Sequence, residues 1–190
     1  MKKTLALAFV LMPTLALAAS APPQPHIVVI DRAAIMKFSK VGQDIARQVQ
    51  NYANQAKKDL SAQGRALQKE GQDLQQQVAI LAPDLKQKKI AAFEARQSSL
   101  QNAAQSKDDQ IRGGLIAARD AVEKVLGPVL EAIVRERGAN MVLDKQAVVY
   151  ASSPAFDITG EAIEKLNAKM STYHVTMQAP PAPSSAVARN

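Results

Sequence analysis

A ladder of apolar residues at helical spacing, broken only once, constrains the fold of this chain most strongly. Apolar or small residues recur at steps of three and four from Val41 to Leu81, and a second such ladder runs from Ile90 to Val129. Steps of this size are typical of α-helices, and their alternation beyond Leu60 is the a/d pattern of a coiled coil. The sequence therefore predicts two long helices that each need a helical partner along a narrow face.

The break between the two ladders is the segment ILAPDLKQKK, residues 80–89. Proline fits the first turn of a helix and disfavours helical geometry in the residue before it, so the chain is expected to turn at Pro83. The arms 41–81 and 85–126 are each roughly 60 Å long at ~1.5 Å per residue. We expect an antiparallel coiled-coil hairpin over residues 41–126, with its tip near residues 80–89, which projects because it is too long for a small globule.

Short β-branched runs flank this helical region. Residues 27–30 lie between Pro25 and Asp31 and predict a strand buried on both faces, after which Asp31 can cap a brief helix. Past Gly138, which is typical of a helix stop, residues 140–143 and 147–150 predict a β-hairpin. Thr159 can cap a last amphipathic helix.

The strands are expected to build a small β-rich body from residues 26–40 and 127–173. Strands of four or five residues bury too little surface to be stable alone, so the body is expected to self-associate. The predicted fold class is α+β, mostly α, with the hairpin projecting from an oligomerisation body. The residues predicted to form that body are Ile27, Val28, Val29, Ile30, Met141, Val142, Leu143, Val148, Val149 and Tyr150.

Glycines interrupt the helical region at a cost of roughly 0.8–1 kcal/mol each relative to alanine. Gly64 and Gly71 also occupy seam positions where leucine would pack. Two interpretations remain open: the glycines accommodate Phe93 or another bulky group across the seam, or they leave the arm under-packed so that it can bend. The residues predicted to give the arms flexibility are Gly64, Gly71, Gly113, Gly114, Gly127 and Pro128, the last two as a kink.

Both ends of the chain have the composition of segments outside the folded core. Residues 1–18 combine two lysines, a short apolar run and a small-residue ending, which predicts a cleaved secretory signal and a mature chain from Ala19. An uncleaved membrane anchor is the alternative, but the run is shorter than the ~20 residues that span a bilayer. Residues 19–25 predict a flexible leader, and the Pro- and Ala-rich residues 174–190 predict a disordered tail.

Composition narrows the classes of function. The 190 residues include no cysteine, which removes thiol catalysis and thiolate metal sites from an exported chain. Basic side chains outnumber acidic ones between residues 44 and 124, so acidic or anionic partners are expected there. Lys86, Lys88, Lys89 and Arg96 cluster near the predicted tip and are candidates for electrostatic capture of a partner, although such a run also serves solubility alone.

The sequence holds little that could carry catalysis. His26 and His174 are the only histidines and lie far apart, and adjacent carboxylates at Asp108 and Asp109 point about 100° apart on a helix. No nucleophile elbow, zincin motif or phosphate-binding G-x-x-x-x-G-K-[ST] loop occurs. We therefore expect a protein that is not an enzyme, uses no ATP and has no metal or cofactor.

Two regions carry a family resemblance. The segment HIVVIDRAAIM near the start, and above all ANMVLDKQAVVYASSPAFDITGEAIEKLN at residues 139–167, resemble the Skp/OmpH family of periplasmic chaperones over roughly residues 26–170. The resemblance implies a jellyfish-like homotrimer in the periplasm, whose β-rich body bears three helical prongs. It also implies that the cavity between the prongs holds unfolded outer-membrane proteins without ATP. For the basic residues near the tip, an anionic membrane or lipopolysaccharide surface remains a further candidate partner.

Two other classes of function fit parts of the pattern. A structural spacer or envelope adaptor is the main alternative, because a rod with an oligomerising body is also a tether. A basic coiled coil can bind nucleic acid, but the export signal separates this chain from the nucleoid and no recognition motif is present, so no nucleic-acid partner is expected.

Overall fold

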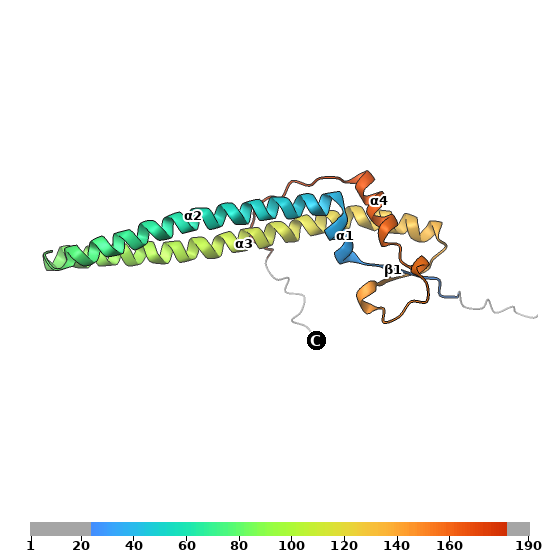
Figure 1. Ribbon diagram of the computed structural model, residues 1–190, viewed down its shortest axis with the longest axis horizontal. Helices are drawn as coiled ribbons and strands as arrows, with labels where there is room; N and C mark the ends of the chain where they lie inside the picture. The colour runs from blue at the N-terminus through green and yellow to red at the C-terminus, as the bar shows by residue number, and fades with distance from the viewer. Residues whose placement is uncertain (1–23, 182–190) are drawn as a thin grey trace, which may run out of the picture.

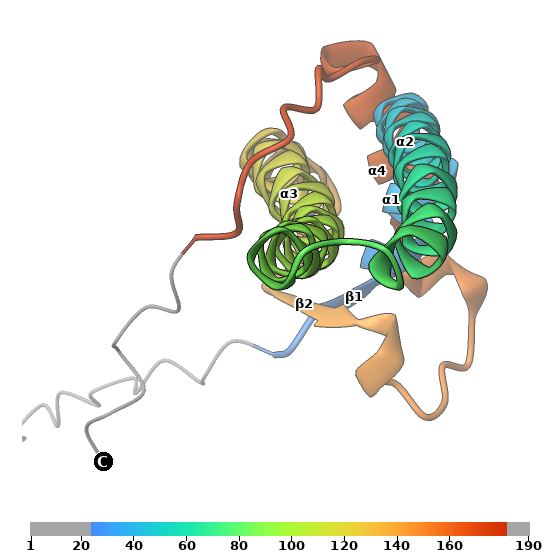
Figure 2. The same cartoon turned by 90° about the vertical axis from the view of Figure 1, so that its left-hand side faces the viewer.

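A pair of long antiparallel helices that extends from a small base dominates the computed structural model, which describes residues 24–181 (Figure 1). Helix α2 (Lys40–Val78) runs outward and α3 (Pro83–Glu136) returns beside it. The 39 residues of α2 correspond to a length of about 58 Å at ~1.5 Å per residue. The two helices remain side by side when the molecule is viewed from its tip (Figure 2).

The turn at the tip follows from the proline. Ala82 has extended backbone geometry, with φ −60° and ψ 147°, and Pro83 is the first residue of α3. Asp84 lies in the first helical turn, where a negative charge interacts favourably with the helix dipole. The chain therefore reverses direction where the sequence predicts it.

Helix α3 continues past the point where the sequence predicts the arm to end. Gly127 and Pro128 lie inside the helix rather than at its end. The neighbouring residues Val129 and Ile133 are buried, and their packing holds the helical path although Pro128 cannot donate a backbone hydrogen bond. The last helical residue is Glu136, and Gly138 follows two residues later as the predicted helix stop.

The helix stop at Gly138 is a Schellman motif. Gly138 has φ +62°, a left-handed conformation that glycine adopts without steric cost. Its N–H donates to the Arg135 carbonyl at 3.2 Å, and the Ala139 N–H donates to the Val134 carbonyl at 2.9 Å. These two bonds satisfy helix-end carbonyls and direct the chain into the base.

The base combines two short strands with two short helices. Strand β1 (Ile27–Ile30) pairs in parallel with β2 (Met141–Asp144), so that Ile27 lies opposite Met141. Asp31 caps α1 (Arg32–Phe38) by accepting a hydrogen bond from the Ala34 N–H at 2.8 Å, as predicted. The last helix, α4 (Thr159–Lys169), packs against α1 and α3.

The predicted hairpin between residues 140–143 and 147–150 is wrong. Strand β2 pairs with β1 instead, and Lys145–Ala147 form a 3-10 turn in which Asp144 accepts a hydrogen bond from the Gln146 N–H. The other edge of β1 is taken by residue 157, because Ile158 donates its N–H to the Val29 carbonyl. Within residues 24–181, the segment 147–150 has no strand partner, and Val149 and Tyr150 are exposed at 102% and 82%.

The hydrophobic core lies at the junction of the base and the helix pair. It draws on β1, the first turns of α2, the second half of α3 and one face of α4. The core residues that are buried are Val28, Ile30, Ile35, Val41, Ile45, Ala118, Val122, Leu126, Val129, Ile133, Ile158, Ala162, Leu166 and Val175. The core therefore anchors the root of the helix pair and leaves its distal part outside.

The segment after α4 also differs from the prediction. The sequence predicts disorder from residue 174, but residues 171–181, which we call the strap, run in extended form from α4 across α2 to α3 (Figure 2). Val175 is fully buried in the core, so this prediction was wrong for residues 174–181. Alternating apolar side chains outweigh the Pro- and Ala-rich composition here. The predicted signal 1–18, most of the leader and residues 182–190 lie outside the described residues.

Candidate functional site

The tip of the helix pair exposes both charge and apolar surface. Lys86, Lys88 and Lys89, here called the tip lysines, are all exposed, and Lys89 donates a hydrogen bond to Gln77 across the turn at 2.7 Å. Arg96 does not join them, because it forms an ion pair with Glu70 of α2. The positive charge at the tip is therefore concentrated on the three lysines.

Two apolar residues beside the tip lysines were missed by sequence reasoning. Ile80 is 85% exposed and Leu85 is 46% exposed. The sequence did contain a signal for the exposure of Ile80, because this residue falls between the seam positions Val78 and Leu81 and so lies off the predicted seam. The tip thus presents a mixed cationic and apolar surface, which suits anionic and partly apolar partners.

The distal helix pair, residues 57–112, is a thin layer without a core. No residue in this range is buried, and the seam side chains Leu60, Leu67 and Leu100 are only partly covered. Alanine and serine beside these leucines leave shallow depressions between the helices, of about 510 Å³ near Ala104 and about 260 Å³ near Glu70. A broad, mixed surface is thus available along both helices.

Four of the glycines in the arms, Gly64, Gly71, Gly113 and Gly114, differ in their surroundings. A Cβ on Gly64 would meet nothing within 4 Å, whereas one on Gly71 would lie 3.1 Å from Cζ of Phe93. Gly113 and Gly114 are buried under the strap, and a Cβ on Gly113 would lie 2.1 Å from the Gln178 carbonyl oxygen. The structure thus pairs Gly71 with Phe93 and the later two glycines with the strap.

Apart from Ile27, Leu143 and Val148, which are half-buried, the body residues predicted for oligomerisation divide into two sets. Val28, Val29 and Ile30 of β1 are buried within the subunit and serve its own core. The second set is exposed on the base, together with Phe38 and Phe156, which sequence reasoning did not single out. Its members are Met141, Val142, Val149 and Tyr150.

A groove of about 680 Å³ lies on the base between α1, the start of α2 and α3. Its lining is mostly apolar and includes Met36, Leu115 and Leu130, with Arg32 and Glu123 at the rim. Arg32 lies between the carboxylates of Glu123 and Asp144, at 3.8 and 3.9 Å. Together with the exposed residues of the base, this groove provides apolar surface for contact with another polypeptide.

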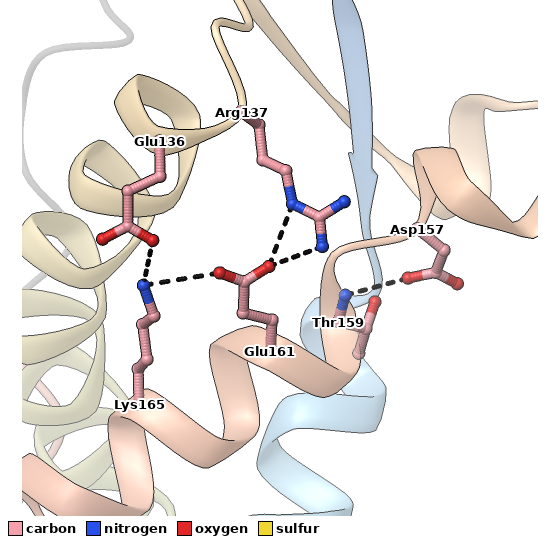
Figure 3. Close-up of polar contacts among 6 residues, drawn as sticks. All are labelled: Glu136, Arg137, Asp157, Thr159, Glu161 and Lys165. Carbon is pink, nitrogen blue, oxygen red and sulfur yellow. Dashed lines mark hydrogen bonds and ion pairs between the residues drawn. The ribbon is translucent and has the colours of Figure 1, made fainter.

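A network of ion pairs joins the end of α3 to α4 (Figure 3). Arg137 donates two hydrogen bonds to one carboxylate oxygen of Glu161, at 3.1 and 2.7 Å, and holds the pKa of Glu161 below its ordinary value. Lys165 contacts Glu136 and lies 3.4 Å from Glu161, and its pKa is raised mainly by the hydrogen bond to Glu136. The network joins α4 to the end of α3.

Asp157 tethers the loop that precedes α4. Its carboxylate accepts the Thr159 N–H at 2.9 Å at the start of α4 (Figure 3). It also pairs with Lys145 at 2.8 Å. Burial alone would raise the pKa of Asp157, but the hydrogen bonds from Lys145 and Thr159 outweigh it and lower the pKa. The prediction that Thr159 caps α4 is wrong, because Ile158 precedes the helix and Oγ1 of Thr159 instead accepts a hydrogen bond from the Asp31 N–H at 2.9 Å.

The remaining candidate groups are structural. Nδ1 of His26 lies 2.9 Å from the Gly138 carbonyl oxygen, so this ring ties β1 to the end of α3, and His174 is exposed. Asp109 pairs with Arg112 on its own helix. Across residues 24–181, no three His, Asp or Glu side chains are grouped to hold a metal ion, and no helix is long and apolar enough to cross a membrane.

Comparison with known proteins identifies the family. No curated protein matches the chain, whereas six chains of solved structures do. Among these is the crystal structure of a candidate outer membrane chaperone (OmpH-like) from Caulobacter crescentus, with a TM-score of 0.75 and 20% identity over 85% of this chain and 95% of that chain. At this identity the likeness shows the fold. A family model described as outer membrane protein (OmpH-like) matches residues 26–166. Because that match spans well over half of the 190 residues, the chain belongs to the family of OmpH-like outer membrane proteins.

Proposed function

We propose that this protein is an ATP-independent holdase chaperone that binds unfolded outer-membrane proteins and prevents their aggregation. The observation that carries the proposal is the absence of any buried residue between positions 57 and 112, although both helices there have apolar seams. Such a layer buries little surface within its own subunit. Its partly covered leucines and alanines remain available to a client.

The surface chemistry of the distal helix pair suits many sequences rather than one. Strands of outer-membrane barrels alternate apolar and polar side chains, so an unfolded barrel presents both kinds of group along its length. The mixed Ala, Leu and Gln side chains of this surface can contact both kinds weakly. Several helix pairs acting on one client would raise the effective concentration, so avidity replaces a tight pocket.

The exposed apolar residues of the base support self-association, which we propose to be a homotrimer. Strand β2 is an edge strand of a two-stranded sheet, and unpaired edges readily add strands from another chain. The apolar segment 147–150, without a strand partner in its own subunit, is suited to cover such an edge. Three helix pairs projecting from a shared base would enclose a client between them.

The tip surface supports a role in contact with anionic partners. The tip lysines lie beside the exposed Ile80 and Leu85, a combination that favours acidic client segments or the surface of an anionic membrane. We propose that the protein acts in the periplasm, after export by the signal predicted at residues 1–18. Because the sequence has no ATP-binding loop, binding and release would depend on client folding alone.

An aggregation assay tests this function. An unfolded outer-membrane barrel protein is diluted from denaturant into buffer with a molar excess of the chain, and light scattering is followed over time. We expect the scattering to be suppressed when the molar concentration of assembled oligomer exceeds that of the client. Unchanged scattering would reject the holdase function and favour the structural spacer, for which a rod on an oligomerising base is sufficient.

A further inference from the structure

The strap is held on the helix pair through its main chain. The Val175 N–H donates to Oε1 of Gln48 at 3.0 Å, and Nε2 of the same glutamine donates to the Tyr173 carbonyl at 2.7 Å. Further along, the Gln178 N–H donates to the Gln110 carbonyl at 3.2 Å. Bonds of this kind recognise an extended backbone and do not depend on its sequence.

The side chains of the strap alternate between solvent and the surface formed by α2 and α3 under the strap, here called the strap groove. Tyr173, Val175 and Met177 pack against the core cluster, whereas His174 and Thr176 are exposed. This period of two is the pattern of an extended segment. It is also the apolar and polar alternation found in the strands of membrane barrels, which carry aromatic residues at their ends.

Two adjacent glycines let the backbone lie close to α3. A Cβ on Gly113 would come within 2.5 Å of main-chain atoms of Ala179 and Pro180, and a Cβ on Gly114 would lie 2.8 Å from the Thr176 carbonyl oxygen. Real Cβ atoms do not approach backbone this closely. We call this pair of glycines the cradle, because it makes room for a polypeptide main chain rather than for a side chain.

The strap groove continues past the strap along α2 and α3. A depression of about 200 Å³ lies next to Met177 and is lined by Tyr52 of α2 and Ile111 of α3. A second, of about 360 Å³, lies between Gln178 and Asn102. The family match ends at residue 166, before the strap begins, so the groove is built by matched residues and filled by a segment outside the match.

We propose that this groove is a binding site for extended polypeptide with alternating apolar and polar side chains, and that the strap occupies it as an internal competitor. The identity of the external ligand as a strand of an unfolded barrel rests on the proposed function. The site itself rests on the main-chain hydrogen bonds, the alternation and the cradle.

Competition by a tethered segment has a predictable strength. A segment joined to its site by a short linker acts at an effective concentration in the millimolar range. A free ligand of equal intrinsic affinity must therefore exceed that concentration or engage further contacts along the helix pair. The strap would thus exclude short or weakly matching segments and yield to long clients.

The test uses full-length chains and a labelled synthetic peptide with the sequence of residues 171–181, titrated by fluorescence anisotropy. Val175→Asp removes the buried anchor of the strap and leaves the groove unfilled. We expect this variant to bind the peptide at least about tenfold more tightly than the wild type. Met177→Asp, which changes a less buried anchor, is titrated in parallel, and circular dichroism verifies that each chain remains helical.

A matched pair of double substitutions separates the cradle from helix propensity. Gly113→Ala with Gly114→Ala, added to Val175→Asp, fills the cradle and should abolish peptide binding. Gly64→Ala with Gly127→Ala adds two methyl groups where nothing lies within 4 Å and should leave binding unchanged. Equal binding by the wild type and both strap variants, or binding that survives the filled cradle, would overturn the proposal.

The ligand class is tested by competition on the Val175→Asp chain. A peptide with alternating apolar and polar residues should displace the labelled peptide at least about tenfold better than a peptide of the same composition with its apolar residues in one block. Equal displacement would refute the ligand class. None of these titrations contains a folding client, so their failure leaves the aggregation assay intact, and failure of that assay leaves the groove as a site for the strap.

Discussion

Replacing glycine by alanine should have different effects at three positions of the helix pair, although the helical backbone is the same. At Gly64 the added methyl group meets nothing, so the full gain in helix propensity of about 0.8–1 kcal/mol is expected. At Gly71 the methyl group would lie 3.1 Å from Phe93, a contact tighter than usual that a half-exposed ring can relieve by a small shift. The expected gain there lies between zero and that at Gly64.

At Gly113 the sign should reverse. The methyl group would lie 2.1 Å from the Gln178 carbonyl oxygen, so the strap must leave its place. Exposure of Val175 then costs roughly 1.5–3 kcal/mol, against a propensity gain of about 1 kcal/mol. The net loss is therefore about 0.5–2 kcal/mol. For a chain of this length, 1 kcal/mol corresponds to a shift of roughly 2–4 °C in Tm.

Thermal unfolding by circular dichroism measures this series at one fixed protein concentration, because the proposed self-association would make Tm depend on concentration. Hydrogen exchange at the amides of Val175 and Gln178, both donors in the strap, reports whether the strap has left. If Gly113→Ala raised Tm as much as Gly64→Ala while both amides stayed protected, the inferred close approach of strap and helix would be wrong.

Further predictions concern the tip, the ion-pair network and the base. Changing the tip lysines together to Gln should weaken capture of an acidic client at low salt and matter less at high salt, because screening shortens the reach of surface charge; equal weakening at every salt concentration would exclude electrostatic capture. The control removes the same charge from the base, at Lys40, Lys124 and Lys169. Because the pKa of Glu161 is lowered in the folded chain, its stabilising contribution is complete above its ordinary value of 4.5 and is lost as the pH falls through the folded pKa. Denaturant unfolding between pH 6 and 3 should therefore show a shallower loss of stability for Glu161→Gln than for the wild type. Lysine at both Val149 and Tyr150 should lower the mass measured by sedimentation without unfolding the subunit, and an unchanged mass would place the interface elsewhere.

Local signals were sufficient to predict the elements that depend on neighbouring residues. Pro83 fixes the turn between α2 and α3, Asp31 caps α1, and Gly138 ends α3 in a left-handed conformation. Each of these is decided within a few residues along the chain. The strand at residues 27–30 was also predicted, because a short run of β-branched residues between Pro25 and Asp31 favours a strand.

Features that depend on distant partners could not be predicted in the same way. The composition of residues 147–150 favours a strand, but only the three-dimensional arrangement shows that β1 has already taken β2 and residue 157 as its neighbours. Gly113 and Gly114 were interpreted as flexible points, whereas their surroundings show a backbone lying on them. The alternation of Tyr173, Val175 and Met177 was visible in the sequence, but its binding groove was not.

The parallel pairing of β1 with β2 also dictates an order of folding. His26 and Asn140, which flank the two strands, are hydrogen-bonded although 114 residues separate them. Closing so large a loop is slow unless the intervening chain shortens it first, and α2 and α3 form from contacts between neighbouring turns. We therefore expect α2 and α3 to pair from the tip toward the base before β1 and β2 form the sheet. If the chain is exported as proposed, β1 would stay unpaired until residues 141–144, about three quarters of the way along the 190 residues, had passed through the translocation channel.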